Sequence, residues 1–208
     1  MSSKSHWEKV YREKASTDVS WFQEHDALSL SMIDQTGLPT SAAIIDVGAG
    51  ASTLVDDLLA RGFGNITVLD LSTAALQAAR ARLGNNATRV QWLAGDLLDT
   101  PLPRHAYDLW HDRAVFHFLT KEQDRHAYVE KVQHAVKPGG LVMVATFAED
   151  GPSHCSGLPV SRYNAGSLHA QFGQAFELLA QQRETHHTPT GKEQKFVYCL
   201  CRMKIGKA

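Results

Sequence analysis

The chain has 208 residues, of which 43% are hydrophobic and 21% charged, as expected for one globular domain with a full core. Its formal net charge is −1, so no basic excess favours DNA or RNA as a partner. No run of about 18 apolar residues predicts a membrane span, and the polar N-terminus is not typical of a secretory signal.

Cysteine and histidine usage indicates neither disulfides nor metals. Cys199 and Cys201 lie two positions apart, and Cys155 stands alone. Residues two apart on a strand face the same side and cannot easily form a disulfide. We therefore expect reduced thiols in a cytoplasmic protein. The eleven histidines lack the spacing of a zinc motif, so we expect no metal site.

The first part of the chain predicts helix over residues 5–37, interrupted by turn formers near residues 17–20. Short apolar strands and helices then alternate. The expected strands cover residues 42–47, 65–69, 89–93, 107–110 and 141–147, and the expected helices cover 52–60, 73–83 and 121–136. This alternation predicts an α/β fold with a doubly wound, mostly parallel sheet that carries helices on both faces.

The C-terminal part departs from this alternation. We expect a short helix over residues 167–172 and two strands over 176–183 and 196–202, joined by a long turn. These strands form an antiparallel C-terminal hairpin and bring the sheet to seven strands.

A glycine turn follows the first expected strand, in the sequence DVGAG that begins at Asp46. Gly48 and Gly50 let a ligand approach bare backbone, and Asp70, which closes the next strand, suits the hydroxyls of a ribose. Thr53 stands where a dinucleotide-binding turn has its third glycine, and the carboxylate of Asp46 would repel phosphate. The turn thus favours a nucleoside cofactor that carries a cation, although an acidic residue at a strand end also serves as a helix cap.

Five segments in this order resemble the motifs of class I S-adenosylmethionine-dependent methyltransferases. They are DVGAG, Asp70, AGDL at 94–97, YDLWHD at 107–112 and KPGGL at 137–141. The resemblance implies a Rossmann-like methyltransferase fold, S-adenosyl-L-methionine as cofactor and S-adenosyl-L-homocysteine as product. It implies that Asp70 binds the ribose, that Leu71 packs on adenine and that Asp96 accepts from the adenine amino group. The candidate cofactor-binding residues are Trp21, Asp46, Gly48, Ala49, Gly50, Asp70, Leu71, Asp96, Leu97 and His111.

The aromatic sequences WEKVY at 7–11 and SWF at 20–22 resemble the lead-in of the thiopurine and thiol methyltransferase group, and of some protein-lysine methyltransferases. In such enzymes this segment folds over the cofactor and screens the acceptor. The resemblance implies one domain with an N-terminal helical lid over 1–38, a cofactor-binding core over 39–148, and an acceptor loop and closing hairpin over 149–208. The same aromatic side chains could simply anchor a helix on the sheet, and the mobility of the lid stays open.

Candidate acceptor residues follow the fourth and fifth expected strands, because open α/β sheets bind ligands at the carboxyl ends of their strands. An imidazole there could accept a proton, and an arginine could clamp an anion. Direct methyl transfer needs no covalent nucleophile, so Cys155 is not expected to act as one. The candidate catalytic residues are His111, Asp112, Arg113 and His117, and the candidate substrate-binding residues are Tyr11, His154, Arg162 and Tyr163.

These observations predict transfer of a methyl group to a sulfur, nitrogen or oxygen atom. Near-neutral charge and an aromatic lid favour a small-molecule acceptor. A protein-lysine methyltransferase is the alternative, and it would present an open, acidic acceptor face. An NAD-dependent oxidoreductase and a non-catalytic S-adenosylmethionine-binding module are alternatives from other classes. We expect no nucleic-acid or membrane partner, and a monomer or homodimer.

Overall fold

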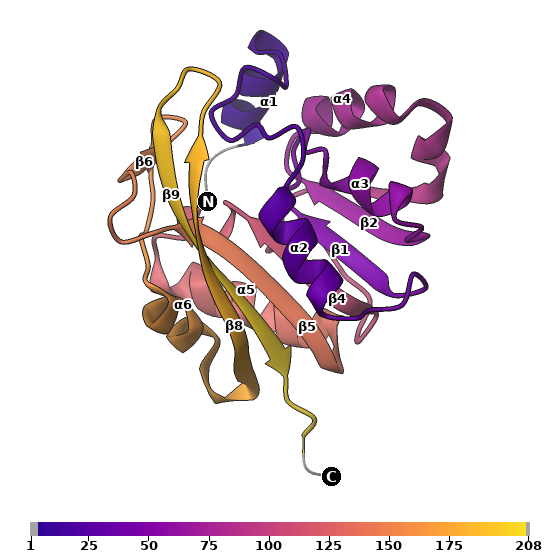
Figure 1. The fold of residues 1–208 in the computed structure, drawn as a ribbon, viewed down its shortest axis with the longest axis vertical. Coiled ribbons are helices and arrows are strands. Elements are labelled where there is room, and N and C mark those ends of the chain that lie inside the picture. Colours follow the sequence, from indigo (N-terminus) through magenta and orange to yellow (C-terminus); the bar gives the residue numbers. More distant parts are fainter. Residues whose placement is uncertain (1–3, 207–208) are drawn as a thin grey trace.

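The computed structural model describes residues 4–206. A seven-stranded sheet runs through the molecule (Figure 1). In spatial order its strands are β3 (Val90–Ala94), β2 (Asn65–Asp70), β1 (Ala43–Val47), β4 (Tyr107–Arg113), β5 (Val136–Phe147), β9 (Glu193–Met203) and β8 (Phe176–His187). The pairings from β3 to β5 are parallel, whereas β9 pairs antiparallel with both β5 and β8. The predicted Rossmann-like fold with its antiparallel C-terminal hairpin is confirmed.

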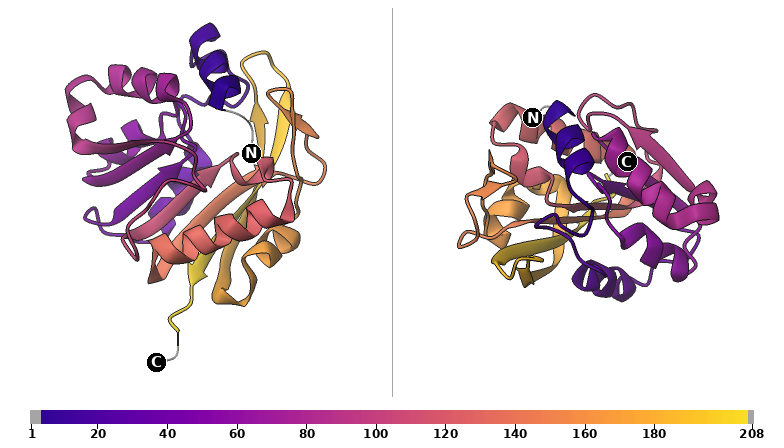
Figure 2. Two further views of the ribbon diagram at one scale, coloured as in Figure 1. Left: turned by 180° about the vertical axis from the view of Figure 1, so that it is seen from behind. Right: turned by 90° about the horizontal axis from the view of Figure 1, so that it is seen from above.

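Helices cover both faces of the sheet (Figure 2). One face carries α2 (Ala27–Gln35), α3 (Leu54–Ala60) and α4 (Thr73–Leu83), and the other carries α5 (Glu122–Ala135) and α6 (Ala165–Phe172). Each face holds its own apolar cluster, and every residue of β1 is buried between the two. This burial on both sides explains why β1 is apolar at every position except Asp46.

The structure also has three short 3₁₀ helices, η1 (Gly84–Arg89), η2 (Phe116–Phe118) and η3 (Gly173–Ala175). A two-stranded hairpin, β6 (His154–Cys155) with β7 (Leu158–Pro159), follows β5. α1 (Lys4–Glu13) lies beyond the end of the sheet where the parallel strands terminate (Figure 1). Both segments therefore approach the edge at which open α/β sheets bind ligands.

Local signals explain where several elements begin and end. Ser72 caps α4, its hydroxyl accepting from the amide of Ala75 at 3.2 Å, and Gly84 ends that helix with a φ of 56°. The N-terminal helical region differs from expectation, since a connector over residues 14–26 separates α1 from α2. β8 and β9 are also longer than predicted, which leaves a hairpin loop of residues 188–192 only.

No helix within residues 4–206 is both long and apolar enough to cross a membrane. The three cysteines are free thiols, as predicted.

Candidate functional site

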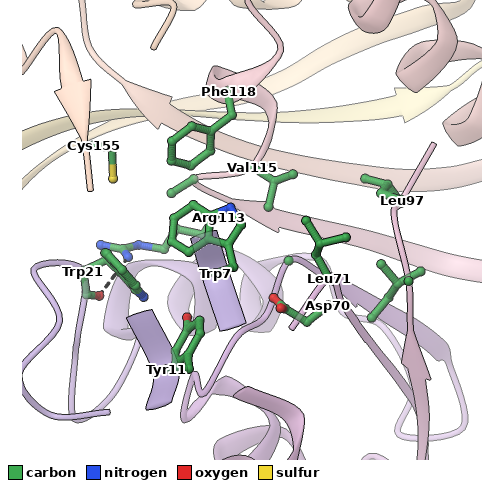
Figure 3. A pocket seen from close by; sticks show the side chains of 14 residues that line it. Trp7, Tyr11, Trp21, Asp70, Leu71, Leu97, Arg113, Val115, Phe118 and Cys155 are labelled. Carbon is green, nitrogen blue, oxygen red and sulfur yellow. Dashed lines mark hydrogen bonds between the residues drawn. The ribbon is translucent and has the colours of Figure 1, made fainter. Parts of the chain in front are cut away.

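Two adjoining cavities lie at the carboxyl ends of β1, β2 and β4. We call the first the aromatic cavity (Figure 3); it is lined by Trp7, Tyr11, Trp21, Gly48, Leu69, Asp70, Leu71, Gly95, Leu97, Arg113, Ala114, Val115, Phe118 and Cys155. We call the second the polar cavity; it is lined by Tyr11, Ser16, Val19, Trp21, Phe22, Gln23, Asp26, Asp46, Gly48, Ala49, Ala51, Ser52, Thr53, His111 and Arg113. Tyr11, Trp21, Gly48 and Arg113 line both, so one extended ligand could occupy the pair.

The glycine turn lies where the two cavities meet, since Gly48 lines both of them. Gly48 and Gly50 have φ values of 61° and 57°, which glycine adopts readily. A Cβ on Gly48 would lie 1.8 Å from Val115 Cγ2, and one on Gly50 would lie 2.0 Å from the Tyr11 hydroxyl oxygen. Both positions thus require glycine for its backbone conformation and for the close approach of side chains from α1 and the loop after β4.

Asp70 lies buried at the end of β2 and organises this turn. Its Oδ2 accepts from the Gly50 amide and its Oδ1 from the Ser72 amide, each at 2.7 Å. Burial raises the pKa of the carboxyl to about 6, although both hydrogen bonds oppose the shift. Each carboxylate oxygen keeps a further acceptor site, and Asp70 lines the aromatic cavity beside Leu71 (Figure 3). The arrangement suits a ligand with a pair of hydroxyls.

Asp46 and His111 form a buried pair at the ends of β1 and β4. The sheet register places the two residues side by side, and Asp46 Oδ1 lies 2.7 Å from His111 Nδ1. His111 Nε2 lies 2.9 Å from Ser29 Oγ on α2. Within residues 4–206, Asp46 Oδ2 is buried without a hydrogen-bond partner. This oxygen belongs to a residue that lines the polar cavity, where a positively charged ligand group would satisfy it.

Arg113 ties together three distant parts of the chain. Its Nε donates to the Tyr198 hydroxyl at 3.0 Å and its Nη1 to the Trp21 carbonyl at 3.3 Å, while Nη2 lies 3.5 Å from Glu184 Oε2. The guanidinium also lies over the ring of Phe196, 4.5 Å from its centroid. Arg113 therefore holds the N-terminal connector against the C-terminal hairpin and is not a free anion clamp.

Aromatic side chains from α1, the connector and η2 enclose the end of the aromatic cavity. Trp7 makes edge contacts with Trp21 and Phe118, with ring centroids 5.6 and 5.4 Å apart. Cys155 of β6 lies in the same wall (Figure 3), and burial raises the pKa of its thiol to about 12. Cys155 is thus a protonated thiol at neutral pH, in keeping with the expectation that it is no nucleophile.

Glu8 attaches α1 to the N-terminal end of α4. Its carboxylate accepts from the backbone amides of Thr73 at 2.7 Å and Ala74 at 3.3 Å. These hydrogen bonds hold the pKa of Glu8 below its usual value, although partial burial opposes them. A second contact, between His6 Nε2 and Ser156 Oγ at 3.3 Å, joins α1 to the loop beside β6. The N-terminal helix is therefore docked over the cavities from both sides.

Several predicted site residues lie outside the described lining of both cavities. The Asp112 carboxylate accepts from the amides of Val115 and Phe116 and from the Tyr128 hydroxyl, at 2.6 Å, so it organises the turn after β4. His117 is buried, and burial together with Arg113 lowers its pKa to about 3. The geometry gives neither side chain access to an acceptor in these cavities.

The predicted acceptor residues of the later loops also lie elsewhere. His154 and Arg162 are exposed, with Arg162 donating to the Gly151 carbonyl at 3.1 Å. Tyr163 is buried against Phe116 in the apolar cluster on the face of the sheet that carries α5 and α6. Asp96 accepts from the Leu98 amide at 2.9 Å. Its sequence neighbours Gly95 and Leu97 line the aromatic cavity, whereas Asp96 is outside the described lining. Their predicted roles stay predictions.

The structure adds lining residues that the motifs did not identify: Gln23, Val115 and Phe118. Val115 and Phe118 follow the fourth strand directly, so their place at its carboxyl end was a usable signal. Gln23 carried no such signal, because its position depends on contacts with distant residues. Among residues 4–206, no cluster of three His, Cys, Asp or Glu side chains could hold a metal ion.

Comparison with known sequences places this site in context. Residues 44–140 match the family described as a methyltransferase domain. The chain is 22% identical over 195 residues to EEF1A lysine methyltransferase 2 of Homo sapiens, covering 87% of this chain and 77% of that protein. It is 28% identical over 166 residues to the ubiquinone biosynthesis O-methyltransferase of Nitrosomonas europaea, covering 78% of this chain and 63% of that protein.

Solved structures share the fold. A Haloferax volcanii chain, from a complex between the Trm112 methyltransferase activator and a putative methyltransferase, superposes with a TM-score of 0.78 at 17% identity, covering 100% of both chains. An S-adenosylmethionine-dependent methyltransferase from Anabaena variabilis gives a TM-score of 0.73 at 16% identity, and the match covers 98% of this chain and 96% of that chain. At these identities the likeness shows the architecture alone.

Proposed function

The chain is a class I S-adenosylmethionine-dependent methyltransferase, and on that premise we propose that it methylates a small molecule enclosed in the aromatic cavity. The predicted cofactor and reaction class are thereby established, whereas the acceptor is the proposal. S-adenosylmethionine supplies an activated methyl group on a sulfonium ion. The protein has to align an acceptor with that group and exclude water, which are large effects in a two-substrate reaction.

We assign the adenosyl end of the cofactor to the part of the aromatic cavity lined by Asp70, Leu71 and Leu97, and the aminoacyl end to the polar cavity, on Asp46. The part lined by Trp7, Phe118 and Cys155 is then left for the acceptor. The carboxylate of Asp70 offers acceptors for the two ribose hydroxyls. The unpartnered Asp46 Oδ2 suits the aminoacyl ammonium. The residues shared by both cavities then lie between the two ends of the cofactor, close to the methyl group.

The observation that carries the small-molecule proposal is the enclosure of the aromatic cavity. Trp7 from α1, Trp21 from the connector, Phe118 from η2 and Cys155 from β6 contribute walls from four separate segments. Such enclosure buries most of a small ligand. We assign α1 and the connector as the cover of the site, residues 39–148 as the cofactor-binding core, and residues 149–206 as the part that completes the acceptor side. The α2 end of the predicted lid packs against the sheet, and residues 1–3 and 207–208 of the predicted ranges lie outside the described residues.

The chemistry of the lining further favours an acceptor that arrives deprotonated. The titratable side chains around the aromatic cavity are Tyr11, Asp70, Arg113 and Cys155. Burial raises the pKa of both Tyr11 and Cys155, so neither is an ionised base at neutral pH. Asp70 is assigned to the Gly50 and Ser72 amides and to the ribose hydroxyls, and Arg113 is held by Tyr198, Trp21 and Glu184. A thiolate needs no base from the protein, whereas an ammonium or alcohol does.

A protein-lysine acceptor is the second candidate, because the match to EEF1A lysine methyltransferase 2 spans 87% of this chain. A lysine side chain that entered between α1 and the β6–β7 hairpin would displace the contact between His6 and Ser156.

Incubation with cell extract and S-adenosylmethionine labelled in its methyl group tests this proposal. After separation by size, we expect the label in the small-molecule fraction, and a panel of thiols, phenols and amines then identifies the acceptor atom. Label confined to proteins would contradict the proposal and support the lysine alternative. The Asp70→Ala variant serves as the control, since it should transfer no label.

A further inference from the structure

We propose that the side-chain carbonyl of Gln23 binds the ammonium group of S-adenosylmethionine together with Asp46, and that Glu184 of the C-terminal hairpin positions Gln23 for this contact. Gln23 lies in the connector between α1 and α2, outside the motifs of the core. The inference concerns the cofactor's amino-acid tail and does not depend on the identity of the methyl acceptor.

The first observation is a pair of buried acceptors without donors. Gln23 Oε1 and Asp46 Oδ2 are both buried, and neither has a hydrogen-bond partner in the described part of the chain. Both residues line the polar cavity. Buried acceptors are almost always satisfied, by protein, water or ligand. Two acceptors around one cavity call for a ligand group with several N–H donors, and an ammonium group has three.

The second observation is that Gln23 is held in place at two other points. Its Nε2 donates to Glu184 Oε1 at 2.7 Å, which fixes the orientation of the amide and leaves Oε1 as the free end. Its backbone carbonyl accepts from the Thr53 hydroxyl at 3.0 Å. Thr53 is the residue in place of the third glycine of a dinucleotide turn. That substitution thus gives the connector an anchor beside the cofactor turn.

The third observation is that Glu184 is itself fully engaged. Its Oε2 accepts from the Tyr198 hydroxyl at 2.7 Å and lies 3.5 Å from Arg113 Nη2. Asp46 is held in a similar manner by His111, whose Nδ1 lies 2.7 Å from Asp46 Oδ1. Both acceptors are therefore pre-organised by residues behind them, which lowers the cost of ordering them when the ligand binds.

Two ligands that differ only in the tail test the assignment. S-adenosylhomocysteine carries the ammonium group, whereas 5′-methylthioadenosine lacks the amino-acid portion. We would measure both dissociation constants by calorimetry for the wild type and for Gln23→Met, which conserves side-chain length and removes the amide. The ratio of the two constants within one variant cancels any loss of folded protein. Gln77→Met, at an exposed position of α4, is the matched control.

We expect Gln23→Met to raise the dissociation constant of S-adenosylhomocysteine by about tenfold or more, as for loss of a hydrogen bond to a charged group. The dissociation constant of 5′-methylthioadenosine should stay within about twofold of the wild-type value. Gln77→Met should change neither. Glu184→Ala should shift the ratio in the same direction as Gln23→Met, and an unchanged ratio would refute the role of Glu184.

Equal weakening of both ligands by Gln23→Met would overturn the proposal, because it would show that Gln23 supports the fold alone. Unchanged binding of both would overturn it too, since Oε1 would then be satisfied by water. If the methionine variant does not fold, Gln23→Asn provides the same comparison, because the shorter amide cannot bridge Glu184 and the ligand. Its expected outcome is the same selective loss of S-adenosylhomocysteine binding.

Discussion

His111 Nδ1 lies 2.7 Å from Asp46 Oδ1, and this buried contact joins the carboxyl ends of β4 and β1. Burial alone would lower the pKa of His111, but the charge of Asp46 and the hydrogen bond to it raise the pKa above its usual value. The pair therefore binds a proton more tightly in the folded protein than in the unfolded chain.

This pair predicts a pH-dependent stability. Because the folded pKa of His111 is raised, its contribution is fully present below the unfolded value of about 6.5 and is lost as pH rises through the folded value. His111→Phe leaves the buried Asp46 carboxylate unpaired and should destabilise the protein by about 3–5 kcal/mol. Urea unfolding at several pH values measures both effects. If the difference in free energy of unfolding between the wild type and His111→Phe grew as pH rose above neutrality, this account would be contradicted.

Cofactor affinity should follow the ionisation of Asp70. Burial raises its pKa to about 6, and the protonated acid has fewer acceptor sites for the ribose hydroxyls. We expect the affinity for S-adenosylhomocysteine to rise as pH increases from 5 to 7, with a midpoint of about 6. Asp70→Asn should bind more weakly and lose this dependence in calorimetric titrations. A pH profile retained in that variant would assign the titration to another group.

The contacts of Asp112 predict a role in folding. Tyr128→Phe removes the 2.6 Å hydrogen bond to Asp112 and should destabilise the protein by about 1–3 kcal/mol. Binding of S-adenosylhomocysteine should be unchanged once the protein is folded. Denaturant unfolding and calorimetry check the two statements. A large loss of methyl transfer at unchanged stability would instead favour the catalytic role predicted for Asp112 from the sequence.

Glu8 should control how firmly α1 covers the site. Glu8→Ala removes the carboxylate that accepts from Thr73 and Ala74, so limited proteolysis in the connector should become faster. S-adenosylhomocysteine should restore protection if it binds beneath α1. Glu13→Ala, at an exposed position of the same helix, is the control and should behave as the wild type. Equal cleavage rates for both variants would show that Glu8 does not fasten this helix.

The fold followed from sequence because its signals are local. The central strands β1 and β2 are short, mostly apolar segments, Ser72 and Gly84 mark the ends of α4, and the glycine turn at Gly48 lies directly after β1. The alternation of side chains along β4 also separates Asp112 from His111, since neighbours on a strand face opposite sides of the sheet. Applied to this segment, that rule would have placed the two residues on different faces.

The remaining parts of the site depend on contacts that no local pattern records. Gln23 meets Glu184 across 161 positions of sequence, and Ser29 meets His111 across 82. Arg162 and Tyr163 follow the correct strand, yet Arg162 is exposed and Tyr163 packs into the apolar cluster beneath α5 and α6. Position after a strand end predicts which loop approaches the site, and packing decides which side chains reach it.

The most direct test of the account is a thermal-shift comparison of S-adenosylmethionine, S-adenosylhomocysteine and NAD. At about 100 times its dissociation constant a ligand stabilises the folded state by about 2.7 kcal/mol, which for a chain of this size corresponds to a rise in Tm of about 5–10 °C. We predict this rise for both adenosyl ligands, none for NAD, and none for any ligand in Asp70→Ala. Absence of a shift with either adenosyl ligand in the wild type would contradict the account.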